Sequence, residues 1–264
     1  MTTLLKLGGS LITDKRGEKA FRQDVMRRIA NEVERAHNRS PQRLVIGHGS
    51  GSFGHVPANK YGTINGVHSD DGWRGFTEVA RVASELNELV TGELWNAGLP
   101  AMRIQPSASL IAHDGVPAQM DVMAIKAALD HGLIPVVHGD VAFDDVRGGT
   151  IISTESLFTY LAGRLTVRSI ILAGEVPGVL DDSGRVIPQI TPESAATIAH
   201  NLGGSSGTDV TGGMLTKVTD MLRLVIQNPS IRIHIINGLE TDALLHALVG
   251  DYSGGTVIHA GSNA

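Results

Sequence analysis

The stretch T-L-L-K-L-G-G-S, residues 3–10, joins a short apolar run directly to two glycines and a serine. Thr3–Leu7 has the length and composition of a buried strand. Gly8 and Gly9 leave the backbone bare where that strand ends, and Lys6 places an ammonium group beside them. Backbone amides in such a turn bind anions, phosphate above all. The segment therefore predicts a strand whose carboxyl end is a phosphate-binding turn.

Strand and helix patterns alternate from this point along the rest of the chain. The helical pattern is clearest in Phe76–Ala97, where apolar residues recur at helical spacing. Thr191-Pro192 is a typical helix start, and Gly132 closes another helix. We expect further strands at Arg43–Ile46, Ala101–Gln105, Ile134–His138, Ser169–Ala173, Ile231–Ile236 and Thr256–His259. This alternation predicts an α/β fold, in which helices cover both faces of a mostly parallel sheet and ligands bind at the carboxyl ends of the strands.

Two hairpins interrupt the alternation. One turns at Gly148-Gly149, between Val141–Phe143 and Thr150–Ile152, and the other has its tip at residues 181–184. No linker rich in proline, serine or glycine divides the sequence. We therefore expect one domain over residues 1–260, followed by a short tail at residues 261–264.

The composition excludes several kinds of partner and site. The net charge of −5 gives no basic field for nucleic acid or an anionic membrane, and the absence of cysteine excludes disulfides and thiolate chemistry. The apolar run at the N-terminus is too short, and too soon followed by charge, for a signal peptide or a membrane span. A cytoplasmic protein is expected. Lysine is scarce, six against sixteen arginines, so each lysine beside a glycine turn is informative.

A second glycine-rich turn occupies Gly47–His55, directly after the strand at Arg43–Ile46. It contains the G-x-G-x-x-G spacing of dinucleotide-binding turns. That interpretation fails on context, because Asp70 and Asp71 lie in a polar turn with no strand before them, and Pro57 should interrupt the helix. An anion cradle with a histidine at its exit remains.

The third turn is D-V-T-G-G-M-L-T-K, residues 209–217, ahead of an amphipathic helix expected at Met214–Gln227. Lys217 should lie about one turn into that helix, near its anion-binding end. Lys15 follows the first turn after a short loop, so three of the six lysines, Lys6, Lys15 and Lys217, lie beside such turns. Each turn taken alone also fits a tight connection with solvated lysines. The P-loop and protein-kinase signatures are absent.

The motifs that carry a family resemblance are K-L-G-G-S-L-I-T-D-K (6–15), H-G-S-G-S-F-G-H (48–55), H-G-D-V (138–141), D-V-T-G-G-M-L-T-K (209–217), I-N-G (236–238) and G-T-V-I (255–258). Through them the sequence resembles the amino acid kinase superfamily and, within it, the isopentenyl phosphate kinases. The resemblance implies an open αβα sandwich, a homodimer, and transfer of the ATP γ-phosphoryl group to isopentenyl phosphate, with Mg²⁺ arriving on ATP. It also implies an acceptor-binding part at about residues 1–165 and a nucleotide-binding part at about 166–260.

Site residues follow from the resemblance position by position. The catalytic residues would be Lys6, Lys15 and His55. The nucleotide would be bound by Lys6, Gly8, Gly9, Ser10, Ser50, Glu175, Gly213 and Lys217, and the acceptor by Gly49, Gly54, His55 and Gly139. Three departures stand out: Ser50 replaces a glycine, G-E-V-P-G (174–178) replaces T-D-V-D-G, and I-S-T-E (152–155) replaces an S-G-D-D-like stretch. The last departure argues against a catalytic role for Glu155.

A phosphate acceptor explains why a histidine, and no aspartate, follows the second turn. A phosphate monoester has a second pKa of about 6, so it needs no general base at neutral pH. Two anions must instead be held against their repulsion, and His55 suits that task as a hydrogen-bond donor. His48 is interpreted as structural, and no histidine has the spacing of a metal ligand. Candidate contacts for the apolar tail are Val79, Val82, Ala83 and Leu86, although packing of this stripe on the sheet is the alternative.

Two other functions remain open at this stage. A related kinase for another phosphate- or phosphonate-bearing acceptor, such as fosfomycin, has similar turns. A non-catalytic nucleotide sensor of the same fold would not need both Lys15 and His55.

Overall fold

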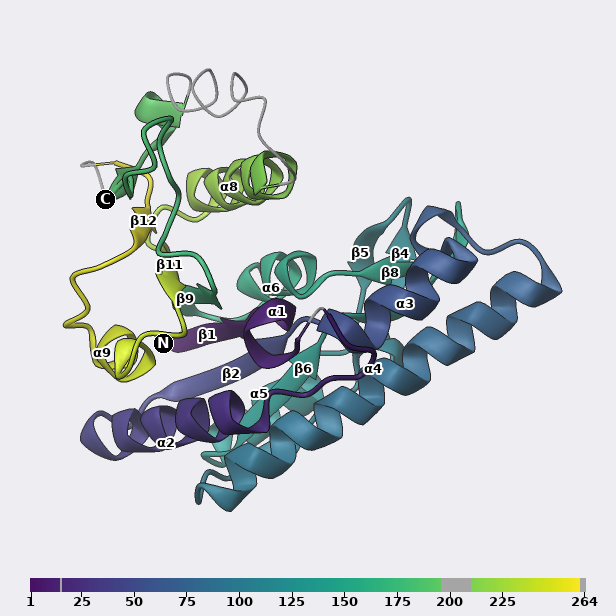
Figure 1. Ribbon diagram of the computed structural model, residues 1–264, viewed down its shortest axis with the longest axis horizontal. Coiled ribbons are helices and arrows are strands. Elements are labelled where there is room, and N and C mark those ends of the chain that lie inside the picture. Colours follow the sequence, from purple (N-terminus) through teal and green to yellow (C-terminus); the bar gives the residue numbers. More distant parts are fainter. Residues whose placement is uncertain (15, 196–209, 262–264) are drawn as a thin grey trace.

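The computed structural model describes residues 1–14, 16–195 and 210–261, and the side chains within 210–213 are left undescribed. Its centre is an eight-stranded sheet with the strand order β10-β12-β11-β9-β1-β2-β6-β3 (Figure 1). Only β11 and β12 pair antiparallel within it. The strands are β1 (Thr2–Leu7), β2 (Arg43–His48), β3 (Ala101–Arg103), β6 (Ile134–His138), β9 (Val167–Gly174), β10 (Gln189–Ile190), β11 (Arg232–Asn237) and β12 (Thr256–Ile258). Every strand expected from the sequence is present.

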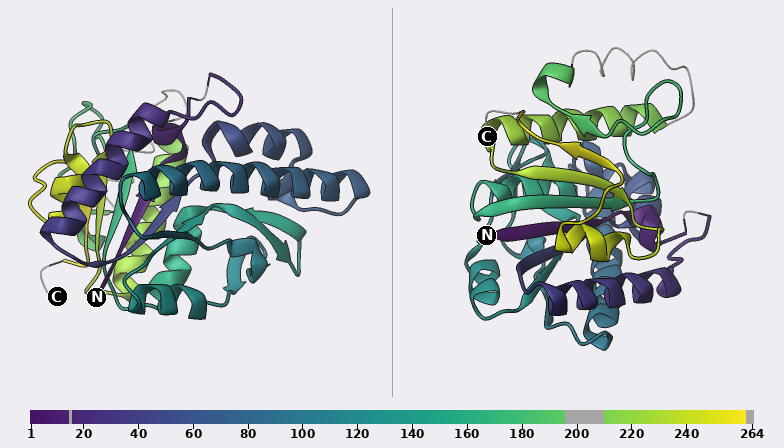
Figure 2. Two further views of the ribbon diagram at one scale, coloured as in Figure 1. Left: turned by 90° about the horizontal axis from the view of Figure 1, so that it is seen from below. Right: turned by 90° about the vertical axis from the view of Figure 1, so that its left-hand side faces the viewer.

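Helices cover both faces of the sheet, as the alternation of patterns predicted (Figure 2). Successive side chains of a strand point to opposite faces, so Leu4 joins one buried cluster and Leu5 the other. The Leu4 cluster packs under α5 (Met123–Asp130), α6 (Thr154–Ala162) and α8 (Val210–Gln227). The Leu5 cluster packs under α2 (Gln23–Arg39), α4 (Asp70–Asn96) and α9 (Ala243–Val249). The fold is therefore an open αβα sandwich.

A smaller sheet, in the order β5-β4-β7-β8, extends from one end of the sandwich. Its strands are β4 (Ile111–His113), β5 (Val116–Gln119), β7 (Asp140–Asp144) and β8 (Gly148–Ile152). The hairpin predicted around Gly148-Gly149 is thus confirmed as β7–β8, whereas β4 and β5 were not foreseen. Two 3₁₀ helices lie beside this sheet, η1 (Thr63–Asn65) against β8 and η2 (Pro106–Ala108) against β7, and α3 (Gly51–Tyr61) leads into η1.

Three helix predictions need correction. Pro57 does not interrupt the helix after the second turn, because α3 begins at Gly51 and continues through Pro57 to Tyr61. A proline at this position removes one backbone hydrogen bond without ending so short a helix. α4 begins at Asp70, where the Ser69 side chain accepts a hydrogen bond from the Gly72 amide. α8 begins at Val210, so Lys217 lies about two turns into that helix rather than one.

The tail contacts proposed on α4 lie inside the protein, and their role stays a prediction. Val79, Val82, Ala83 and Leu86 are all buried in the hydrophobic core. Val82 and Leu86 pack in the Leu5 cluster on the sheet, as the alternative interpretation of the stripe predicted, whereas Val79 joins a smaller cluster with Val67, Phe76 and Val141. The other local predictions hold, since Leu180 and Val186 form an antiparallel bridge around the tip at 181–184, and a helix begins at Pro192.

Gly148 offers a test of this architecture. Its φ is +71°, and a Cβ atom there would lie 2.2 Å from the Val67 carbonyl oxygen. We expect Gly148→Ala to lose at least about 3 kcal/mol of unfolding free energy, because backbone strain and a steric clash add. Urea unfolding monitored by circular dichroism measures the loss.

Gly184→Ala is the matched control. Gly184 has a φ of +78°, yet nothing lies within 4 Å of a Cβ atom built there. It should lose only the strain of a left-handed residue, about 1–2 kcal/mol. Equal losses in the two variants would contradict the close contact between Gly148 and Val67.

Candidate functional site

The first and second glycine turns touch each other through their backbones. A Cβ atom on Gly9 would lie 2.5 Å from the Gly51 nitrogen, and one on Gly49 would lie 3.0 Å from the Gly9 nitrogen. Thr13 links the two turns, because its hydroxyl donates to the Gly9 carbonyl (2.7 Å) and accepts from the Ser52 amide (2.9 Å). This approach is closed to any residue with a side chain. The turns after β1 and β2 thus form a single backbone surface at the carboxyl edge of the sheet.

Two lysines flank one carboxylate at this edge. The Lys6 Nζ atom, at the end of β1, lies 2.5 Å from Glu155 Oε1. The Lys217 Nζ atom, on α8, lies 3.4 Å from the same oxygen. Glu155 stands in the first turn of α6, where the Ser153 side chain caps the helix. Lysines from two distant parts of the chain are therefore gathered around the carboxylate that the sequence analysis set aside.

Burial and charge act against each other in this cluster. Burial lowers the pKa of Lys6, and the nearby Lys217 ammonium lowers it further, while the Glu155 carboxylate opposes both effects. Burial alone would raise the pKa of Glu155, but the two ammonium groups and the hydrogen bond from Lys6 together lower it to about 2. Glu155 is therefore ionised at neutral pH.

A cleft of about 910 Å³ runs along this edge of the sheet. It is lined by ten of the residues predicted from the sequence: Lys6, Gly8, Gly9, Ser10, Gly49, Ser50, His55, Gly139, Glu175 and Lys217. Gly54 does not line the cleft but lies next to Ser50, and a Cβ atom on Gly54 would clash with the Ser50 side chain. Lys15 is outside the described residues, and of Gly213 only the place in the first turn of α8 is described. Ile64, Ile151 and Ile152 give the cleft an apolar stretch.

The backbone amides of the cleft fall into two groups. Those of Gly8, Gly49 and Gly139 donate to the carbonyls of Ala173, Leu7 and His48, so these three glycines contribute shape. Within the described part of the chain, by contrast, the amides of Gly9 and Ser10 have no hydrogen-bond acceptor. Two free amides thus stand next to Lys6 and can donate to an anion.

His48 and His55 have different surroundings, as expected. His48 is fully buried, stacks on His138 and lies 3.0 Å from the Asn87 side chain of α4. Burial lowers the pKa of His48 to about 3, so the ring is neutral and structural. His55 is exposed to the cleft near the start of α3.

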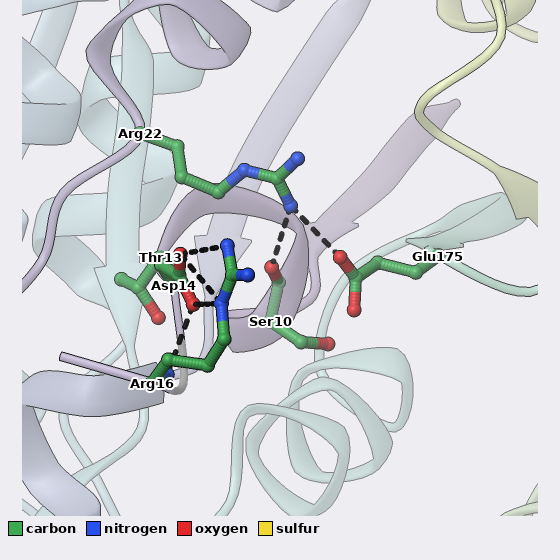
Figure 3. A pocket seen from close by; sticks show the side chains of 6 residues that line it. All are labelled: Ser10, Thr13, Asp14, Arg16, Arg22 and Glu175. Carbon is green, nitrogen blue, oxygen red and sulfur yellow. Dashed lines mark hydrogen bonds and ion pairs between the residues drawn. The ribbon is translucent and has the colours of Figure 1, made fainter.

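A smaller pocket of about 310 Å³ adjoins the first turn (Figure 3). Arg22, which precedes α2, points its Nη1 atom toward the Ser10 carbonyl (3.3 Å) and the Glu175 carboxylate (2.8 Å). On the other side of the pocket, Arg16 pairs with Asp14. Arg22 thus ties the first glycine turn to the segment after β9, which is where Glu175 was expected to contact nucleotide.

Neither metal-ion clusters nor membrane spans are found in the described ranges. No three or more histidine, aspartate or glutamate side chains converge there as metal ligands. The helices of residues 1–14, 16–195 and 210–261 are each too short or too polar to cross a bilayer.

Comparison with known proteins agrees with this geometry. Residues 1–237 match the model of the amino acid kinase family. The chain belongs to the amino acid kinase family. It is 35% identical to the isopentenyl phosphate kinase of Methanocaldococcus jannaschii, over 96% of this chain and 97% of that protein. It is 39% identical to the Haloferax volcanii isopentenyl phosphate kinase, over 84% of this chain and 87% of that one.

A solved structure gives the same relationship for this member of the amino acid kinase family. An X-ray structure of isopentenyl phosphate kinase superposes with a TM-score of 0.81 at 31% identity, covering 98% of this chain and all of the other. The fold and family expected from the sequence are therefore confirmed.

The sequence analysis missed the position of Glu155. Its signal was available, because a carboxylate three residues after a strand, capped by Ser153 at a helix start, projects at the same sheet edge as the lysines. The segment I-S-T-E (152–155) does not match the S-G-D-D-like pattern, so the family resemblance did not indicate Glu155. Glutamate is one methylene longer than aspartate and retains the charge that the lysines require.

The charge of Glu155 predicts a specific acid sensitivity. A carboxylate whose pKa is lower in the folded state than its usual 4.5 stabilises the fold above about pH 4.5, and that stability is lost as the pH falls toward 2. Between pH 5 and pH 3 we expect wild type to lose on the order of 1–2 kcal/mol more than Glu155→Gln, which cannot titrate. Urea unfolding across this pH range measures the difference.

Glu88→Gln provides the comparison, because Glu88 pairs with Arg103 at the surface. A surface pair contributes about 0–1 kcal/mol, so this variant should follow the wild-type pH profile. If Glu155→Gln also follows it, the carboxylate does not stabilise the fold through the two lysines.

Proposed function

We propose that this chain is an isopentenyl phosphate kinase that transfers the γ-phosphoryl group of ATP to isopentenyl phosphate, giving isopentenyl diphosphate and ADP. The observation that carries the proposal is the backbone contact between the turn that holds Lys6 and the turn that leads to His55. That contact joins two anion-binding surfaces at one sheet edge. Full-length similarity to isopentenyl phosphate kinases supports the choice of acceptor.

Lys6, Lys217 and the free amides of Gly9 and Ser10 would hold the β- and γ-phosphates of ATP. Phosphoryl transfer depends mainly on positioning and on neutralising the charge of the transferring group, and these donors supply both. Glu155 would keep the two ammonium groups together before the nucleotide binds. Lys15 is proposed to stabilise the transferring group, and Gly213 to admit a phosphate at the start of α8.

His55 would hold the acceptor phosphate. The acceptor is already ionised, so the enzyme needs a donor that offsets repulsion rather than a base that removes a proton. Gly49, Gly54 and Gly139 would shape the cradle, and Ser50, whose side chain lies against Gly54, lines the same cleft. Ile151 and Ile152, which line the cleft, would contact the apolar tail.

Several parts of the proposal rest on the family resemblance. Mg²⁺ would bind the phosphates of ATP and supply further charge neutralisation. The homodimer and the division near residue 165 also rest on the resemblance and remain predictions. The cytoplasmic location and the single domain over residues 1–260 rest on the sequence pattern and likewise remain predictions.

An acceptor panel tests the proposal directly. Purified protein with ATP and Mg²⁺ should release ADP with isopentenyl phosphate and dimethylallyl phosphate, and not with fosfomycin. Coupled detection of ADP and mass spectrometry of the diphosphate product measure the reaction. Turnover of fosfomycin alone would replace the proposed acceptor, and inactivity with every acceptor would favour a nucleotide sensor.

His55→Ala tests the assignment of the acceptor site. Removing a donor aimed at developing charge should lower kcat/KM for isopentenyl phosphate at least about 10²-fold, while ATP still binds. Steady-state kinetics and nucleotide titration measure the two effects. His131→Ala, which changes an exposed histidine after α5, should retain wild-type rates. Wild-type kinetics in His55→Ala would remove His55 from the site.

A further inference from the structure

One arginine ties together three loops at the far end of the cleft. The Arg147 Nε atom lies 2.9 Å from Asp114 Oδ1, in the β4–β5 turn, and Arg147 Nη1 lies 3.3 Å from the Ile64 carbonyl of η1. Arg147 itself belongs to the β7–β8 turn. All three residues line the cleft that also contains Lys6 and His55. We call the contacts among Asp114, Ile64 and Arg147 the arginine latch.

The turns that carry the latch are themselves fixed. The Asp144 carboxylate accepts hydrogen bonds from four backbone amides, those of Asp114, Gly115, Val146 and Arg147. A Cβ atom at position 115 would lie 2.8 Å from the Arg147 guanidinium, so glycine leaves room for Arg147 there. The Arg147 carbonyl also accepts from the Val67 amide at 2.8 Å. Asp114 and Arg147 are therefore held opposite each other by the backbone.

β8 connects the latch to the reaction centre. It begins next to Arg147 and ends at Ile152, whose carbonyl lies 3.3 Å from the Cβ position of Gly139. Five residue steps at the rise of a β-strand place the latch roughly 17 Å from the acceptor-phosphate cradle. The five-carbon tail of isopentenyl phosphate spans well under half of that distance. A substantially longer tail would reach Arg147 and Asp114.

We propose that the arginine latch limits the length of the acceptor tail. This inference rests on the proposed function. An apolar tail that reached the latch would have to break the ion pair or remove both charges from water, and either change is unfavourable. The ion pair between Arg147 and Asp114 is partly exposed, so it contributes little free energy. The latch would therefore disfavour long tails without excluding them.

Chain-length selectivity tests the latch. In Arg147→Ala the ratio of kcat/KM for farnesyl phosphate to that for isopentenyl phosphate should rise at least about 10-fold, because several methylenes gain an apolar surface. The value of kcat/KM for isopentenyl phosphate itself should stay within about 2-fold of wild type, since its tail ends short of the latch. A merely structural role for Arg147 would lower both values together, and that result would overturn the proposal.

Two further variants test whether the ion pair itself, and not the loss of any arginine, changes the selectivity. Asp114→Asn keeps the size of the side chain and suits the left-handed backbone at this position (φ 46°), and it should raise the same ratio by a smaller factor. Arg185→Ala removes an arginine that pairs with Asp181 in a different hairpin turn, which does not line the cleft, and it should leave the ratio unchanged. An unchanged ratio in both Arg147→Ala and Asp114→Asn would overturn the latch.

Failure of the proposed function would be recognised separately. If wild type is inactive with isopentenyl phosphate, the proposed function is wrong whatever the latch does. Calorimetric binding of farnesyl phosphate without ATP then tests the latch alone. At least about 10-fold tighter binding by Arg147→Ala than by wild type would support it, and equal binding would overturn it.

Discussion

The closeness of two backbones at the carboxyl edge of the sheet is the constraint on which the site depends. Gly9 and Gly51 approach so closely that a single Cβ atom on Gly9 would separate them. The strands β1 and β2 are hydrogen-bonded neighbours, so their turns necessarily emerge side by side. Because glycine has no side chain, the backbones of these two turns can touch directly. Two anions that repel each other in water can then be bound a short distance apart without a side chain between them.

Electrostatics determine what such a contact can hold. An ammonium group as buried as that of Lys6 is costly unless a partner offsets the loss of water. Glu155 is that partner, and it also pairs with Lys217 on α8. With two positive charges and one negative charge, the cluster keeps a net positive charge facing the cleft. An overall acidic protein thereby presents a local cationic site for a polyphosphate.

The sequence predicted the parts of this arrangement that depend on local pattern. Strands such as Thr2–Leu7 and Arg43–His48 follow from apolar runs that end in glycine, and the site loops follow from their position after those strands. Features set by tertiary contacts were harder to predict. Pro57 lies within a helix whose packing tolerates one missing hydrogen bond, and Val79 and Leu86 face the core because α4 crosses the sheet. The place of Glu155 after a strand is a local signal, but its pairing with Lys6 and Lys217 depends on tertiary contacts among β1, α6 and α8.

The shared carboxylate has a further consequence for the reaction cycle. In the proposed reaction, the Lys6 and Lys217 ammonium groups would repel each other once a nucleotide had left. Glu155 lies within reach of both, so the empty site would keep the two ammonium groups together without a bound anion. The binding site for the next nucleotide would therefore already be assembled.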